Sequence, residues 1–338
     1  TTLTNAASTV GGAQGSVSVA GELLLTPPAQ PQVPQSPSLN TQEVPFDIQQ
    51  SGQVTVVAGT IVDYRASTAT GAGKLNVQGT FQPSSTDYAQ QVAMILSSVG
   101  SVYIQPGTTY EAKGDITGSG QLIVGGLYAV GTGSTVNHYA GMTVDSTGTV
   151  FVPQGATLNS YSSSVSGPGN VVVAGTYNNA APTQSFATPL TTSNTGLVNV
   201  AKGSTFQQKA SLYGPGRMNV DGSYQVASSV DHELSTNIAS TGTLTVNQGA
   251  TYTYRNALLS GTGQMNVYGS LAIADAPSYT CELRITADSN ANLYIPPGAV
   301  FYQKNNVLGK GNLNVQGTYS VSANLIHEVN TYVDSTGA

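Results

Sequence analysis

Charged residues are scarce in this chain. Asp, Glu, Lys and Arg make up 8% of its 338 residues, against about 25% in an ordinary soluble domain. Lys and Arg together number 10, which is too few to build the basic surface that binds a nucleic-acid backbone. We therefore expect no nucleic-acid partner.

Cysteine, tryptophan and long apolar runs are rare or absent. Cys281 is the single cysteine and there is no tryptophan, so no disulfide can form within the chain. No apolar run reaches the roughly 18 residues of a membrane-spanning helix, and no membrane span is expected. Polarity comes instead from Ser, Thr, Asn and Gln. This composition favours an extracellular or cell-surface location, with the virion as the alternative.

What the chain has in abundance is a repeated phrase. One form, Gly-x-Gly-x-h-x-Val-x-Gly with h apolar, is typified by GTGQMNVYG and GKGNLNVQG. A related form, Gly-x-h-x-Val/Ile-x-x-Gly, alternates with it and recurs at a nearly constant spacing. Its copies begin at Gly52, Gly100, Gly148, Gly196, Gly242 and, in degenerate form, Asn290.

The repeat predicts a coil of short strands. The alternation h-x-h is that of a strand with one buried face, and glycines at the strand ends permit sharp corners. Because both forms share this grammar, we interpret them as successive turns. The expected fold is an all-β parallel β-helix of about 13 rungs, with 21–27 residues per rung and 46–48-residue double-rung repeats. A β-propeller, whose blades have about 45 residues, is disfavoured because its antiparallel strands are longer.

The predicted core is one continuous inward ladder of aliphatic side chains. Its members are Val56, Val77, Ile104, Val124, Val152, Val173, Val200, Val220, Val246, Val267, Ile295 and Val315.

Three segments are expected within this solenoid. Residues 1–25 form a partial repeat, residues 26–51 a proline-rich linker or arm inserted between rungs, and residues 52–338 six double-rung repeats. Prolines disfavour a central strand and favour an extended course. The arm is either a surface loop or a contact for a neighbouring subunit.

The repeats resemble those of extracellular parallel β-helix proteins, such as filamentous-haemagglutinin-type adhesins, autotransporter passengers and phage tailspikes. The resemblance covers almost the whole chain and rests on the rung grammar alone. It implies the fold and a setting outside the cell. No motif of functional residues from these families matches.

The titratable residues predict no catalytic or metal site. His138, His232 and His327 alternate with Tyr88, Phe186 and Tyr279 at equivalent places of the six repeats. We expect one stacked column, in which alternate repeats lie roughly 19 Å apart, too far to share a metal ion.

Other reactive groups also have ordinary structural explanations. Cys281 lies in a strand-like stretch and is expected to be a buried structural thiol. Asp231, His232 and Glu233 form the densest titratable cluster, but neighbours in a strand point to opposite faces. In the Gly-x-Gly phrases the glycines precede the strand, whereas a dinucleotide site needs them after it. We expect no enzyme activity, cofactor or metal.

The predicted function is that of a structural building block of an extracellular fibre, sheath or surface layer. Both chain ends are expected to cut the repeat inside a rung. Either the chain is a segment of a longer solenoid, or subunits join head to tail as a homo-oligomer or filament, with residues 331–338 of one meeting residues 1–19 of the next; the second is the prediction adopted. The alternatives are a glycan-binding surface adhesin or a virion fibre, with a polysaccharide-degrading enzyme less favoured. The expected contact residues are Thr1, Thr2, Leu3, Val17, Val19, Tyr332, Val333 and Ala338.

Overall fold

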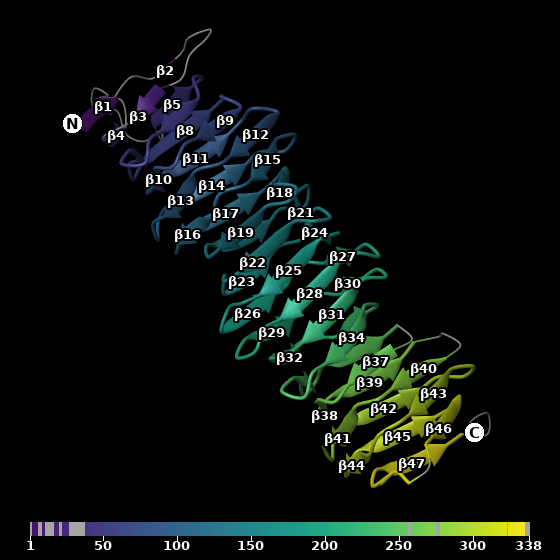
Figure 1. Cartoon of the computed structure of the whole chain (residues 1–338). Coiled ribbons are helices and arrows are strands. Elements are labelled where there is room, and N and C mark those ends of the chain that lie inside the picture. The colour runs from purple at the N-terminus through teal and green to yellow at the C-terminus, as the bar shows by residue number, and fades with distance from the viewer. Residues whose placement is uncertain are drawn as a thin grey trace. The chain divides into compact units, whose positions relative to one another are not determined.

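A computed structural model describes residues 2–5, 9–10, 17–19, 22–26, 38–255, 258–274, 278–322 and 324–334. The chain divides into two compact units, Thr1–Val171 (unit 1) and Val172–Ala338 (unit 2). Each unit is a parallel β-solenoid with three sheets, here named A, B and C (Figure 1). The described residues include no helix, and hence none long and apolar enough to cross a membrane.

In unit 1 the strands pass from sheet A to B to C in every turn. Sheet A contains β1 (Thr2–Asn5), β4 (Glu22–Leu25), β7 (Gln53–Val56), β10 (Lys74–Val77), β13 (Ala93–Leu96), β16 (Ile116–Gly118), β19 (Thr135–His138) and β22 (Thr157–Ser160). Sheet B contains β2 (Thr9–Val10), β5 (Ser38–Gln42), β8 (Thr60–Tyr64), β11 (Thr80–Pro83), β14 (Ser101–Ile104), β17 (Gln121–Val124), β20 (Gly141–Val144) and β23 (Ser164–Ser166). Sheet C contains β3 (Val17–Val19), β6 (Phe46–Ile48), β9 (Thr68–Thr70), β12 (Asp87–Gln90), β15 (Thr109–Ala112), β18 (Leu127–Val130) and β21 (Thr149–Val152). The unit boundary falls within β24 (Asn170–Val173).

Unit 2 repeats the same order. Sheet A contains β25 (Thr176–Asn179), β28 (Leu197–Val200), β31 (Arg217–Val220), β34 (Ser235–Ile238), β37 (Leu258–Gly261), β40 (Tyr279–Cys281), β43 (Val300–Gln303) and β46 (Thr318–Val321). Sheet B contains β26 (Thr183–Phe186), β29 (Thr205–Gln208), β32 (Ser223–Val226), β35 (Thr243–Val246), β38 (Gln264–Val267), β41 (Arg284–Ala287) and β44 (Val307–Gly309). Sheet C contains β27 (Leu190–Thr192), β30 (Leu212–Tyr213), β33 (Val230–His232), β36 (Thr251–Tyr254), β39 (Ser270–Ile273), β42 (Asn292–Ile295), β45 (Asn312–Val315) and β47 (Asn330–Val333).

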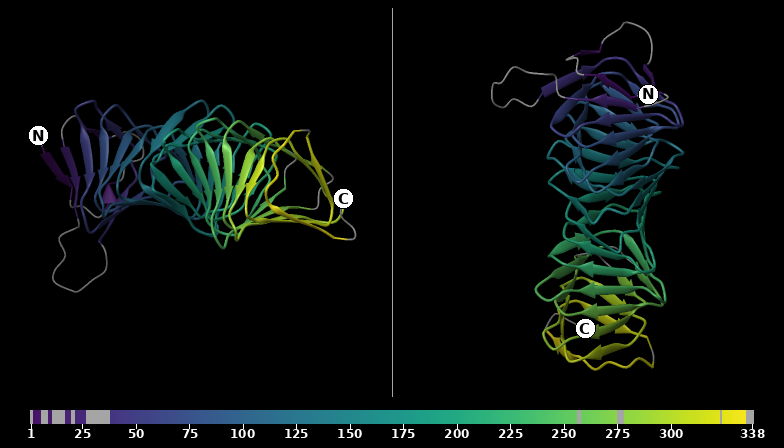
Figure 2. Two further views of the ribbon diagram at one scale, coloured as in Figure 1. Left: turned by 90° about the horizontal axis from the view of Figure 1, so that it is seen from below. Right: turned by 90° about the vertical axis from the view of Figure 1, so that its left-hand side faces the viewer.

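Within each unit the turns of the coil lie side by side (Figure 2). From β1 to β43, each strand pairs in parallel with the strand three places later in the chain, so one turn is three strands. Near the C-terminus, β45 pairs with β47. A regular turn contains few residues, as the residue numbers of paired positions show: Thr109 pairs with Leu127, and Met142 pairs with Val165. The all-β parallel β-helix is therefore confirmed, with turns at the short end of the predicted range or below it.

The three-strand turn corrects the single-ladder prediction. One repeat advances the chain by seven strands, from β7 to β14 or from β28 to β35, which is two and a third turns. Each repeat therefore begins one sheet later than the last. Val56 and Val77 pair on sheet A, whereas Ile104 and Val124 pair on sheet B.

The same shift distributes the other predicted ladder residues over three sheets. In unit 1, Val152 lies on sheet C; in unit 2, the pair Val200 and Val220 lies on sheet A. The next repeat places Val246 and Val267 on sheet B. All twelve predicted ladder residues are buried, with at most 1% of their surface exposed, so their inward orientation is confirmed and only their common column is wrong.

The interior also holds rows of aromatic rings. In unit 1, Tyr88, Tyr110 and Tyr128 come from successive strands of sheet C, with ring centroids 5.0 and 5.6 Å apart. In unit 2, the rings of Phe186 and Phe206 lie 5.1 Å apart. Equivalent inward positions stack because each turn adds one nearly identical layer.

The step along the chain from β4 to β7 is longer than that of a regular turn. Glu22 of β4 pairs with Gln53 of β7, a much longer step along the chain than the one from Thr2 of β1 to its own partner, Glu22. The extra residues lie between β4 and β5, where the chain passes from sheet A to sheet B. Residues 27–37 of the predicted arm lie outside the described residues, while β5 and β6 belong to sheets B and C.

Corner glycines should differ sharply in their tolerance of substitution. Gly167 has φ +114°, and a Cβ there would lie 2.2 Å from the carbonyl oxygen of Val144 on the preceding turn. Gly155 has φ +80° and open space around its Cβ direction. We expect Gly155→Ala to cost about 1 kcal/mol, mainly as backbone strain, and Gly167→Ala to cost at least twice as much, as measured by urea unfolding. Equal losses at the two sites would contradict the close backbone approach at Gly167.

Candidate functional site

The three histidines do not share a column. His138 ends β19 on sheet A of unit 1, and His232 ends β33 on sheet C of unit 2. His327 forms an isolated bridge with Val307 of β44, on sheet B of unit 2. The predicted stacked column is thus wrong for the same reason as the single ladder. Each repeat advances the equivalent residue to the next sheet.

Buried polar side chains at the ends of strands contact backbone carbonyl groups in the corners that follow. Gln208 ends β29, and its Nε2 donates to the carbonyl of Ala210 at 2.9 Å. Gln303 makes the same bond from β43, at 2.8 Å. The Nε2 of His232 lies 3.1 Å from the carbonyl oxygen of Leu234, in the same relation. His232 therefore occupies a structural corner position that glutamine fills elsewhere.

Burial keeps the two inner histidines neutral. Desolvation lowers the pKa of His138 to about 4 and that of His232 to about 3, from an ordinary value of 6.5. The Nδ1 of His232 lies 3.0 Å from the hydroxyl of Tyr224. His327 is exposed, and partial burial lowers its pKa.

The remaining reactive groups are individually satisfied. Burial raises the pKa of Cys281 to about 12, so the thiol stays protonated at neutral pH. The carboxylate of Asp231 lies 3.1 Å from Nε of Arg255, and Glu233 accepts from the backbone N–H of Gly214 at 2.9 Å. Within the described residues no three His, Cys, Asp or Glu side chains are grouped to hold a metal ion. The absence of catalysis stays a prediction.

The expected terminal contact residues are only partly described. Thr1 and Ala338 lie outside the described residues, and Thr2 and Leu3 belong to β1. Val17 and Val19 belong to β3, where Val19 is buried.

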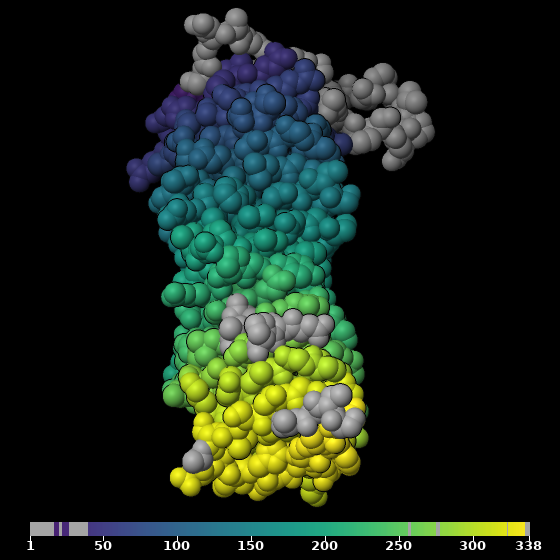
Figure 3. Space-filling view, turned by 90° about the vertical axis from the view of Figure 1, so that its right-hand side faces the viewer, coloured from purple at the N-terminus to yellow at the C-terminus, as the bar shows by residue number. Residues whose placement is uncertain are grey.

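At the other end, Tyr332 and Val333 lie in β47, in the last turns of unit 2 (yellow in Figures 1 and 3), and are 58% and 57% exposed. No observation tests a head-to-tail contact, which stays a prediction.

The outward faces carry uncharged polar columns. In unit 2, Asn178, Asn199 and Asn219 occupy one column of sheet A. Their side-chain amides are joined from turn to turn at 2.8 and 3.3 Å.

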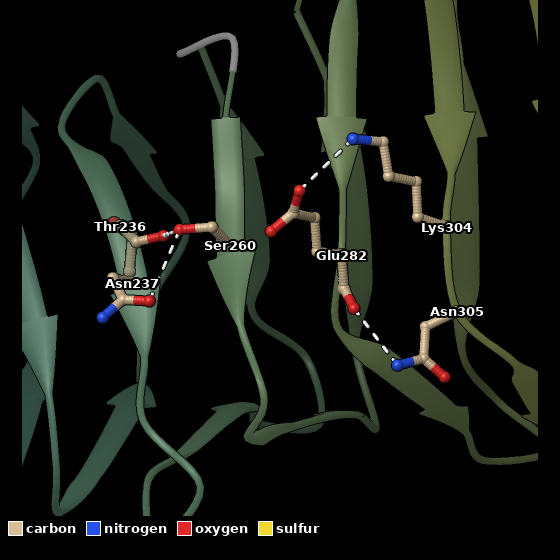
Figure 4. Close-up of polar contacts among 6 residues, drawn as sticks. All are labelled: Thr236, Asn237, Ser260, Glu282, Lys304 and Asn305. Atoms are coloured by element: carbon tan, nitrogen blue, oxygen red, sulfur yellow. Dashed lines mark hydrogen bonds and ion pairs between the residues drawn. The ribbon is translucent and has the colours of Figure 1, made fainter.

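Figure 4 shows the continuation of this column. The Oγ of Ser260 lies 3.5 Å from the Oδ1 of Asn237. The Nζ of Lys304 forms an ion pair with the Oε1 of Glu282 at 3.3 Å. The column is therefore uniform from Asn178 to Asn237 and changes to other polar side chains beyond it.

A shallow groove interrupts the outward face of sheet C in unit 1. Its volume is about 300 Å³. Its floor follows one column, in which Ala89 pairs with Glu111, Glu111 with Ala129, and Ala129 with Phe151. The two alanines leave room that larger side chains would fill, and Phe151 and Pro153 both line the groove.

One ion pair shapes the middle of this groove. Glu111 lies in β15 and Lys113 directly follows that strand, and their charged atoms are 2.8 Å apart. The Lys113 stem packs over Gly131, where an added Cβ would lie 2.6 Å from its Cγ. Lys113 thus neutralises Glu111 beside the groove. A second carboxylate, Asp87, lies in the lining on β12.

The repeat pattern did not reveal this groove. Ala89, Ala129 and Phe151 lie far apart in the chain and at different places within the repeat. Only the pairing of sheet C brings them into one column. The sequence did contain one signal of the groove, which is small residues at outward strand positions. This signal can be used only when the number of residues per turn is known, because that number decides which of these residues are neighbours.

Comparisons with known proteins identify no family for this chain. No protein-family model and no curated protein matches the sequence. Among solved structures, one match is a crystal structure of a TibC-catalyzed hyper-glycosylated TibA55-350 fragment. It is 16% identical, with a TM-score of 0.24, and the match covers 99% of this chain and 96% of that one. This is a loose likeness that says nothing about the chemistry of this chain.

Proposed function

We propose that this chain is a structural building block of an extracellular fibre, sheath or surface layer. The observation that carries the proposal is a regular column of amide side chains on the outward face of sheet A. In unit 2 the amide column from Asn178 to Asn219 repeats one side chain at each turn. Such a face offers identical groups at a fixed spacing of about 4.8 Å to a neighbouring copy.

The charge of the chain supports the same proposal. A formal net charge of −6 is spread over 338 residues, so copies repel one another weakly when they pack closely. Uncharged amide and hydroxyl groups can form hydrogen bonds either to a second copy or to water. This suits a surface that is covered in the assembled chain and solvated in the free chain. The Ser-, Thr-, Asn- and Gln-rich composition fits a location outside the cell.

Electron microscopy of the native material, combined with sedimentation of the purified chain, tests this proposal. We expect fibres, sheets or a lattice in the micrographs, and particles heavier than one chain whose size grows with concentration. Because the faces carry little charge, assembly should persist in high salt. Isolated single chains at high protein concentration, in both low and high salt, would contradict the proposal.

A further inference from the structure

We infer that the groove on sheet C of unit 1 binds a neutral saccharide. Its volume of about 300 Å³ is at the lower end of the range of small-molecule sites, about 300–1,000 Å³. Ala89 and Phe151 lie three turns apart, which makes the column about 14 Å long. The space therefore suits a short saccharide that lies along the axis of the solenoid.

The lining matches the two kinds of surface on a sugar ring. A sugar ring has a face of C–H groups, which packs on an aromatic ring. Phe151 and Pro153 offer an apolar wall for this face. The hydroxyl groups of the sugar donate hydrogen bonds, and carboxylates are the strongest acceptors on a protein surface. Asp87 and Glu111 place carboxylates in the same lining, and Thr109 adds a hydroxyl.

The charges favour a neutral ligand over a charged one. The carboxylates of Asp87 and Glu111 outnumber the one ammonium of Lys113, and this net negative charge disfavours an anionic sugar or a phosphate. A cationic ligand would have to compete with Lys113, whose ammonium already lies 2.8 Å from Glu111. A hydroxylated, uncharged ligand can donate hydrogen bonds to the remaining acceptor positions of the Glu111 carboxylate without displacing Lys113.

Saturation-transfer NMR with three neutral trisaccharides tests the inference: cellotriose, maltotriose and triacetylchitotriose. We expect at least one to receive magnetisation at its ring protons in the full chain. Phe151→Ala removes the apolar wall and should weaken binding at least about tenfold, the equivalent of about 1.4 kcal/mol. Ala129→Trp should abolish binding by filling the groove. Tyr302→Ala, which removes an exposed aromatic ring of unit 2, is the matched control and should bind as the wild type does.

Several outcomes would overturn the inference. These are no transfer to any of the three sugars, transfer that survives both Phe151→Ala and Ala129→Trp, or binding of spermidine in place of the sugars. Phe151 and Ala129 are half-buried outward positions, and unchanged thermal melting of both variants would show that they fold. None of these results depends on whether the chain assembles, so the groove and the proposed fibre are tested separately.

Discussion

Val220→Asp is expected to destabilise unit 2 by about 3 to 5 kcal/mol. Val220 is completely buried, and its partners in the neighbouring turns are Val200 and Ile238. A carboxylate at this position would be desolvated with no cation to pair with. Urea unfolding measures the loss. Hydrogen exchange should show it concentrated in β28 and β34, because a turn contacts only the turns next to it.

Ser223→Asp is the matched control for this charge. Ser223 lies on β32 at a half-buried outward position, where the new carboxylate would meet water. Its cost should stay within about 1 kcal/mol. Equal losses in the two variants, or unchanged protection of β28 and β34 in Val220→Asp, would contradict the inward assignment.

Acid is expected to destabilise both units through their buried histidines. The pKa of His138 is lowered to about 4 and that of His232 to about 3. Above pH 6.5 each histidine is neutral in both the folded and the unfolded state, so neither affects stability there. Below pH 6.5 the unfolded chain binds protons that the folded chain excludes. Each histidine then removes about 1.4 kcal/mol per pH unit from its own unit, or about 3 kcal/mol by pH 4.5.

The chain itself suggests the variants that test this effect. Glutamine occupies the corner position of His232 in other turns, at Gln208 and Gln303. His232→Gln should therefore fold, keep a bond to the Leu234 carbonyl and flatten the decline of stability below pH 6.5. His138→Gln should do the same for unit 1. Free energies of unfolding measured from pH 7.5 to pH 4.5 give the slopes.

His327→Gln separates burial from the mere presence of a histidine. Because His327 is exposed, its replacement should change the slope little. If all three glutamine variants lose stability in acid as steeply as the wild type does, the carboxylates dominate acid unfolding and the buried histidines contribute nothing.

The grammar of the repeat predicted the fold correctly because it encodes local physics. The alternation h-x-h determines which side chains point inward, and the burial of residues such as Val56, Ile104 and Val220 follows from it. Glycines mark the corners, as the positive φ of Gly118 and Gly167 confirms. These properties depend only on residues a few positions apart, so a single sequence contains them.

By itself, then, the sequence determined the class of fold, the inward residues and the absence of an internal disulfide. Only the tertiary structure decided which residues lie above one another. Copies of the same phrase occur on all three sheets, so the pattern fits a repeat of two and a third turns as well as one of two turns. That fraction of a turn moved His138 and His232 out of a common column. The pairing of successive turns likewise placed Ala89, Ala129 and Phe151 in one groove, because strand register is set by contacts between turns and not by neighbours in the chain.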